Sequence, residues 1–190
     1  MELNEQLFWY VARSGGIVAW ALITLSVCWG LMLSTRAAAK ATQAARVLDM
    51  HRFLGGLSIV FTGLHVVGLV GDNYVQFGWS EVLVPLASDW KPGPVAWGVI
   101  AMYLLVAIEL TSLLMKRLPR RVWRAVHRLS LPLYALTTLH GIQAGTDVLN
   151  EWYRIAMFAS INVVGFLLAL LVLAHKKTRD AKPAAASTNA

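Results

Sequence analysis

Four histidines lie in two apolar segments, and their type and spacing favour cofactor chemistry. His51 and His65 lie in MHRFLGGLSIVFTGLHVVGLVG, and His127 and His140 lie in VHRLSLPLYALTTLHGIQAG. An imidazole among hydrocarbon is costly unless it binds a partner. The histidines of the two pairs are 14 and 13 residues apart, which is roughly 20 Å along a helix. This spacing predicts two haems, one above the other, held between two helices.

The two spacings differ in helical phase. At ~3.5 residues per turn, 14 residues complete whole turns, so His51 and His65 face the same neighbouring helix. Thirteen residues fall one short, and on a straight helix His127 and His140 do not line up. Pro132 lies between them, where a missing backbone hydrogen bond can kink the helix and correct the phase.

A metal site and a proton relay both fit the four histidines less well. A zinc or copper site needs three or four ligands at one point, whereas this spacing leaves two at each level. A proton relay accepts two histidines at each level but does not require that the pairs match. Any one histidine in a membrane span is more often a hydrogen-bonded packing residue than a ligand, so the set of four carries the argument.

The composition is that of an integral membrane protein. Hydrophobic residues make up 57% of the chain and charged residues 14%, with a mean hydropathy of +0.58. The single cysteine, Cys28, excludes disulfides and thiolate metal sites. Basic residues at the ends of apolar spans give the net charge of +7, which favours membrane topology over nucleic-acid binding. No nucleotide-binding or zinc-type motif occurs.

Apolar segments predict an all-α bundle of five transmembrane helices, with two b-type haems between the second and fourth. Each span is close to the ~20 residues that cross a bilayer. The expected spans are residues 16–33, 50–71, 94–115, 124–145 and 153–174. The expected divisions of the chain are an external segment at 1–15, a haem-binding membrane domain at 16–175 and a disordered tail at 176–190.

Basic residues concentrate in the connections after the first and third spans and in the tail. By the positive-inside rule, the N-terminus is external and the C-terminus cytoplasmic in a bacterial cytoplasmic membrane. His51 and His127 then lie toward the cytoplasm, and His65 and His140 lie toward the outside.

Three arginines share the level of His51 and His127, namely Arg52, Arg124 and Arg128. Guanidinium groups form charge-assisted bonds with carboxylates, so we expect these residues to bind the propionates of the inner haem. Anchoring of the spans at the membrane surface accounts for the same arginines equally well.

Several glycines flank the histidines and predict clearance for a flat macrocycle, although glycine is also common at helix contacts in membranes. They are Gly55, Gly56, Gly63, Gly68 and Gly141. Glu109 lies in the third span, where a carboxylate is costly unless paired or protonated. Contact with the basic connection and a proton-coupling or quinone-contact role are both open for Glu109.

The connection at 72–93 is the longest between the expected spans. Five of its apolar residues recur at helical spacing and predict a short amphipathic helix at the membrane interface, where it can cap the outer haem. They are Trp79, Val82, Leu83, Leu86 and Trp90. An aromatic belt without a ligand role is the alternative.

The pattern H-x13-H in one span and H-x12-H two spans later, with an arginine after the first histidine of each pair, resembles the ferric reductase-like transmembrane domain. That superfamily includes ferric reductases, NADPH oxidases and the haem-binding membrane subunit of the periplasmic methionine sulfoxide reductase system. The resemblance covers residues 16–175. It implies that His51 and His127 ligate the iron of an inner haem b and that His65 and His140 ligate an outer one.

NADPH oxidases continue into a cytoplasmic region that binds FAD and NAD(P)H, whereas this chain ends after a short tail. We therefore expect a separate flavoprotein reductase or quinone as donor. The expected function is that of an oxidoreductase component, a dihaem b-type cytochrome that transfers electrons across the bilayer to an external acceptor. Three alternatives are a haem-containing anchor subunit of a separate oxidoreductase, a quinol-linked cytochrome working on the outer face only, and a haem-free transport protein.

Overall fold

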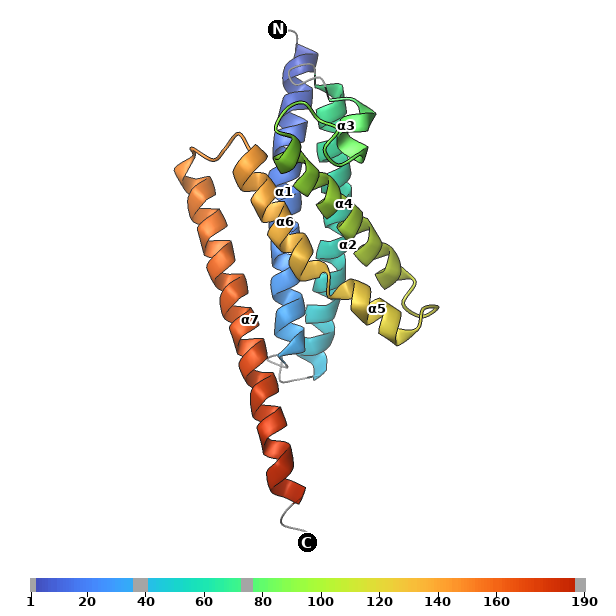
Figure 1. Cartoon of the computed structure of the whole chain (residues 1–190), viewed down its shortest axis with the longest axis vertical. Coiled ribbons are helices and arrows are strands. Elements are labelled where there is room, and N and C mark those ends of the chain that lie inside the picture. The colour runs from blue at the N-terminus through green and yellow to red at the C-terminus, as the bar shows by residue number, and fades with distance from the viewer. Residues whose placement is uncertain (1–2, 36–40, 73–76, 187–190) are drawn as a thin grey trace.

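The computed structural model describes residues 3–35, 41–72 and 77–186, and within those ranges the regular structure is entirely helical (Figure 1). The helices are α1 (Leu3–Ser34), α2 (Ala41–Gly71), α3 (Trp79–Leu83), α4 (Pro92–Leu113), α5 (Arg120–His127), α6 (Ser130–Ala144) and α7 (Glu151–Ala186). Four stretches within these helices are long and apolar enough to cross a membrane, namely Gln6–Ser34, Ala44–Gly71, Pro92–Leu113 and Glu151–Lys177. The chain is therefore a multi-pass membrane protein.

The expected fourth span at 124–145 is not one helix. The backbone N–H of Leu129 bonds to the carbonyl of Val126, three residues back, and a new helix begins at Ser130. Pro132 has no N–H to give to the carbonyl of Arg128, and in the first turn of α6 that loss costs little. Because α6 has 15 residues, short of the ~20 that span a bilayer, five continuous spans are not confirmed.

The first and last helices extend beyond the expected spans. Residues 3–15, which we expected to precede the first span, are part of α1. Residues 176–186, expected to be disordered, continue α7. Lysine, arginine and alanine favour a helix, which accounts for the extension before Pro183.

Only the first half of the expected interfacial piece is helical. α3 ends at Leu83, and Leu86 has a positive φ of 70°. Tyr103 in α4 donates a hydrogen bond to the carbonyl of Leu83 at 2.7 Å, which ties α3 to α4. A hydrogen bond from Ser80, helped by backbone N–H groups including that of Gly78, holds the pKa of Glu81 below its usual value.

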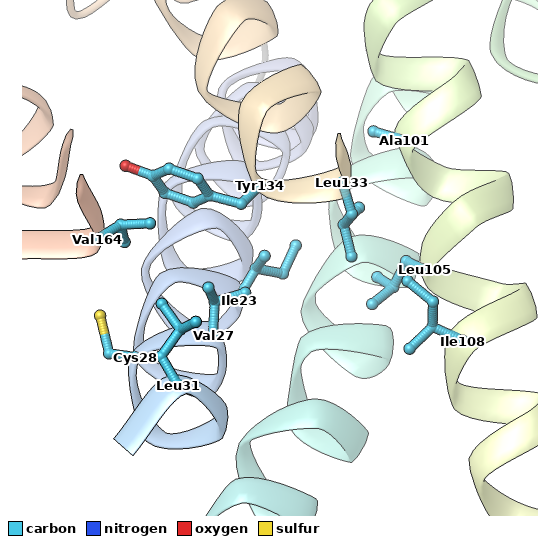
Figure 2. Close-up of a cluster of buried hydrophobic side chains, with 10 residues drawn as sticks. All are labelled: Ile23, Val27, Cys28, Leu31, Ala101, Leu105, Ile108, Leu133, Tyr134 and Val164. Carbon is cyan, nitrogen blue, oxygen red and sulfur yellow. The ribbon is translucent and has the colours of Figure 1, made fainter. Parts of the chain in front are cut away.

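A buried apolar cluster joins α1, α4, α6 and α7 (Figure 2). Ile23, Val27, Cys28 and Leu31 come from α1; Ala101, Leu105 and Ile108 from α4; Leu133 and Tyr134 from α6; and Val164 from α7. The hydroxyls of Tyr134 and Ser160 lie 3.0 Å apart and link α6 to α7. α1 thus packs against α2, α6 and α7 at once.

α1 and α2 approach closely because glycines lie at their contact. A Cβ built at Gly68 would lie 2.5 Å from the backbone nitrogen of Ala12, and one at Gly15 would lie 2.9 Å from that of His65. Small residues allow helix backbones to approach in membranes, where no hydrophobic force between helices helps them. This contact holds α2 against α1.

We expect Gly68→Ala to destabilise the protein. The added methyl meets backbone atoms, which cannot move aside as a side chain can, and overpacking of this kind costs about 1–3 kcal/mol. Thermal unfolding in detergent, followed by circular dichroism, should show a lower midpoint. Gly63→Ala is the matched control, since a Cβ there meets nothing within 4 Å. Equal midpoints for the two variants would contradict the close contact.

Candidate functional site

The structure brings the four histidines together as two pairs. The ring centroids of His51 in α2 and His127 in α5 lie 5.8 Å apart. Those of His65 in α2 and His140 in α6 lie 6.3 Å apart. The ring planes within each pair are nearly perpendicular, at 83° and 77°. α2 and α6 run in the same direction (Figure 1). The His65–His140 pair lies beside the N-terminal half of α1, since His65 bonds to the carbonyl of Ala12.

These separations suit a metal ion between two imidazoles. Two metal–nitrogen bonds of about 2 Å, with about 1 Å from each nitrogen to its ring centre, add to roughly 6 Å. The same separations suit edge-on aromatic contact. The hydrogen bonds of the rings distinguish the two cases.

Three of the four rings bond through Nδ1 to a helix carbonyl. His65 Nδ1 lies 2.6 Å from the carbonyl of Ala12, and His140 Nδ1 lies 2.8 Å from that of Pro94. His51 Nδ1 lies 2.9 Å from the carbonyl of Ser26. A carbonyl only accepts, so each Nδ1 carries the proton and each Nε2 has a free lone pair.

The His65–His140 pair offers two unprotonated Nε2 atoms on neighbouring rings. Neither Nε2 of the His65–His140 pair has a hydrogen bond in the ranges that the structure describes, and both rings line one cavity. Two imidazoles without an Nε2 proton cannot bond to each other. A metal ion satisfies both, and a hydrogen bond from Nδ1 to a carbonyl is the usual support of a metal-binding histidine.

The fourth ring, that of His127, is held differently. Its Nδ1 is buried and has no hydrogen-bond partner among the described residues. The ring stacks on Trp123, one turn earlier in α5, with centroids 5.2 Å apart and an interplanar angle of 22°. His127 is thus positioned by stacking rather than by a carbonyl.

A glycine faces each of the three carbonyl-bonded rings. A Cβ built at Gly16 would lie 2.8 Å from Nδ1 of His65, and one at Gly98 would lie 2.7 Å from Cε1 of His140. At Gly30 the distance to Cε1 of His51 would be 3.3 Å. The glycines leave the space that the rings fill.

Each facing glycine follows the accepting carbonyl by four residues, as in Ala12 and Gly16. In an α-helix the Cβ atom leans toward the N-terminus and lies over the preceding turn. A side chain at the glycine position would therefore cover the carbonyl that the imidazole reaches. We call each carbonyl residue with its glycine a cradle: Ala12/Gly16, Ser26/Gly30 and Pro94/Gly98.

The sequence contains a signal for two of these cradles. Gly16 and Gly30 are 14 residues apart, which is the spacing of His51 and His65, and Ala12 and Ser26 repeat it. Because α1 and α2 are antiparallel and have the same spacing, Gly16 meets His65 and Gly30 meets His51.

The glycines that we expected to give clearance lie elsewhere. A Cβ at Gly56 or Gly63 meets nothing within 4 Å, and one at Gly68 meets Ala12. Gly55 faces the carboxylate of Glu109. Of the five, Gly141 alone lines the cavity beside the His65–His140 pair.

That cavity has a volume of about 260 Å³ and a mainly apolar lining from α1, α2, α4, α6, α7 and the 77–90 segment. Arg13 and Asp147 lie in its wall as an ion pair, with Arg13 Nε donating to Asp147 Oδ2 at 2.7 Å. The guanidinium also lies 4.9 Å from the ring centre of Trp9. The pair ties α1 to the connection between α6 and α7.

The three predicted arginines are exposed. Arg52 Nη1 lies 4.0 Å from a carboxylate oxygen of Asp49. Arg124 Nε donates to the carbonyl of Arg120, and Arg128 Nε to that of Arg124. A second cavity, of about 620 Å³, lies beside α5 and is lined by Met115, Lys116, Leu118, Arg120, Trp123 and Arg124. Of the three predicted arginines, Arg124 lines this second cavity, and Arg52 and Arg128 do not.

Within the described ranges, no three His, Cys, Asp or Glu side chains are grouped so that they could hold a metal ion. Glu109 has no ion pair in that part of the chain; its carboxylate rests against α2 at Gly55. The described residues thus offer two separate pairs of neighbouring imidazoles.

The model of the family described as ferric reductase like transmembrane component matches residues 15–138. The chain belongs to this family. The match includes His51, His65 and His127 and ends just before His140. No solved structure matches the chain.

Two curated proteins are similar to this family member. The haem-binding subunit MsrQ of protein-methionine-sulfoxide reductase from Rhodospirillum rubrum is 29% identical over 167 residues, which cover 81% of this chain and 74% of that protein. Magnetosome protein MamZ from Magnetospirillum gryphiswaldense is 26% identical over 178 residues, which cover 86% of this chain. The chain spans 26% of the length of MamZ.

We expect Gly98→Ala to separate His140 from the carbonyl of Pro94, because the new methyl occupies the space of the ring. In solid-state NMR of protein labelled with ¹⁵N-histidine, the resonance of one hydrogen-bonded Nδ1–H should shift or disappear. Gly16→Ala should do the same for His65. Gly56→Ala, which adds a methyl in open space, should leave all histidine resonances unchanged. Unchanged spectra for all three variants would refute the cradles.

Proposed function

We propose that this chain is a dihaem b-type cytochrome that transfers electrons across a membrane. His51 and His127 would ligate one haem iron, and His65 and His140 the other. The observation that carries the proposal is the pairing of the rings, whose centroids lie 5.8 and 6.3 Å apart, with the Nε2 lone pairs of at least three rings free. Haem would supply reversible one-electron transfer at its iron.

The surroundings of the His65–His140 pair fit such a group. The donors are neutral imidazoles, which are common axial ligands of haem iron. Gly16 and Gly98 make room for the rings themselves, and the cavity beside the rings has a mainly apolar wall that includes Val99 and Leu105. In our proposal the residues of the protein hold the four imidazole rings, keep Nε2 of each ring unprotonated and exclude water from the site.

We treat α5 and α6 together as a fifth crossing, since α6 alone is short for a bilayer. The basic connections favour an external N-terminus and a cytoplasmic C-terminus. On this orientation His51 and His127 form the inner site, and His65 and His140 form the outer site. Arg124, which lines the cavity beside α5, would bind a propionate of the inner haem, with Arg52 and Arg128 nearby.

The electron donor in this proposal is a separate flavoprotein reductase or a membrane quinol, and the acceptor lies outside a bacterial cytoplasmic membrane. The name of one relative supports a partner protein, because MsrQ is the haem-binding subunit of a protein-methionine-sulfoxide reductase. The same name favours a second candidate function, a haem-containing anchor subunit for a separate oxidoreductase.

Ligand pairing is tested by single replacements. We expect His65→Ala and His140→Ala to convert the same one of two haems from low spin to high spin or to remove it, because each iron loses one axial ligand. Electron paramagnetic resonance of the oxidised protein would measure the change. His175→Ala is the control, since His175 is exposed and bonds to the carbonyl of Leu171 in its own helix. Perturbation of different haems by the two variants would overturn the pairing.

Electron transfer is tested in sealed vesicles whose outer surface carries the C-terminal side of the protein. With a flavin reductase or a quinol as external donor, an impermeant acceptor inside should be reduced. His51→Ala and His127→Ala should lower that rate at least tenfold, because the inner site is the point of entry. Transfer at the wild-type rate in these variants would favour entry from the outer face, and no transfer in wild-type vesicles would favour the anchor subunit.

A further inference from the structure

The connection between α4 and α5, together with α5 itself, carries positive charge without a carboxylate partner. Between residues 110 and 146 the sequence has no aspartate or glutamate, and its basic residues are Lys116, Arg117, Arg120, Arg121, Arg124 and Arg128. The ion pairs among the described residues are Arg13 with Asp147 and Arg52 with Asp49. None of the basic residues of 110–146 is in either pair, so a counter-charge from outside the chain is favourable there.

Three of these cations line one cavity. The cavity of about 620 Å³ beside α5 is lined by Lys116, Arg120 and Arg124 together with Met115, Leu118 and Trp123. It is many times larger than the ~30 Å³ that one water molecule occupies in the liquid, so it has room for a phosphate group. The side chains of lysine, arginine and tryptophan donate hydrogen bonds and accept none. A ligand that fits this lining therefore brings acceptor oxygens and negative charge.

Backbone hydrogen bonds fix the segment that carries these cations. The N–H groups of Arg117 and Leu118 both donate to the carbonyl of Leu114, at 2.8 and 3.1 Å. The backbone at Lys116 is thus part of a closed turn, and Arg120 follows at the start of α5. Because this backbone is already ordered, little of the binding free energy is spent on arranging it.

The cavity lies where a membrane span ends. The apolar stretch of α4 is Pro92–Leu113, and the first lining residues, Met115 and Lys116, follow it directly. Leu113, Leu114 and Met115 are exposed, so apolar side chains that can contact acyl chains adjoin the cations. A phospholipid has the same order, with a charged phosphate at the membrane boundary and acyl chains beside the span, and basic pockets at such boundaries bind anionic lipid headgroups.

We propose that this cavity binds the headgroup of an anionic phospholipid. Lys116 and Arg120 hold the phosphate through charge-assisted hydrogen bonds, which are roughly twice as strong as neutral ones. The acyl chains lie against the exposed end of α4. Arg124, which the proposed function assigns to a haem propionate, adds positive charge to the cavity but is not required. Lipid binding at this cavity does not depend on haem ligation.

The probe is phosphatidylglycerol, titrated into the purified full-length protein in a neutral detergent and measured by native mass spectrometry. We expect one phosphatidylglycerol to bind tightly to each chain. Phosphatidylcholine with the same acyl chains should bind about tenfold more weakly, because its choline cation offsets the phosphate charge. Lys116→Gln combined with Arg120→Gln should weaken phosphatidylglycerol binding about tenfold or more, because two charge-assisted bonds are lost.

The matched control is Arg117→Gln combined with Arg121→Gln. This variant removes the same charge at the adjacent positions, and neither residue lines the cavity. Its affinity for phosphatidylglycerol should stay within about twofold of the wild-type value, since exposed charges outside the site contribute little. Lys116→Arg combined with Arg120→Lys keeps both charges at the cavity and should retain the lipid, because both side chains bind phosphate. Equal thermal midpoints for the three variants would exclude misfolding as the cause of a loss.

Equal weakening in the two glutamine variants would reveal a diffuse attraction to positive charge and would overturn the site. Phosphatidylcholine that binds as tightly as phosphatidylglycerol would overturn it too. Inorganic phosphate that displaces the lipid at similar concentrations would overturn the assignment to a lipid, because a free anion would then fill the cavity. All three variants keep the four histidines and Arg124, so their haem absorption should equal that of the wild-type protein. Wild-type protein that binds the lipid but has no haem absorption would refute the proposed function alone.

Discussion

The hydrogen bond from an imidazole Nδ1 to the carbonyl of a neighbouring helix is the interaction on which the arrangement of the site depends. The backbone carbonyl oxygen has two lone pairs, so it can accept one hydrogen bond within its own helix and a second from the imidazole of the neighbouring helix. Access to the second requires that the residue four positions later has no side chain, which Gly16 and Gly98 provide. The bond then fixes the tautomer and the direction of Nε2 together, and it joins two helices.

Much of this arrangement follows from the sequence. The spacing of His51 and His65 predicts two levels on one helix, and the apolar segments predict the long helices. The break before Ser130 was not predicted, because a proline in an apolar run indicates where a helix is disturbed without giving the form of the disturbance. The structure places the break at Arg128 and Leu129, next to His127.

The facing glycines show a different limit of sequence reasoning. Glycines close to a histidine in sequence, such as Gly56 and Gly63, were expected to matter, but they meet open space. The ones that touch the rings lie on other helices, as Gly30 does in α1. Their repeat in α1 matches the repeat of histidines in α2, yet the match has meaning only once the two helices are known to be antiparallel neighbours.

α1 bonds to both histidines of α2, at Ala12 and at Ser26. The same 14-residue spacing therefore occurs in both helices, between Ala12 and Ser26 in α1 and between His51 and His65 in α2. Loss of a single residue between these points in either helix would turn one site by about 100° relative to the other. The number of residues between the two sites can change only if α1 and α2 gain or lose the same number. During evolutionary divergence we therefore expect this part of the chain to accept substitutions far more readily than insertions or deletions.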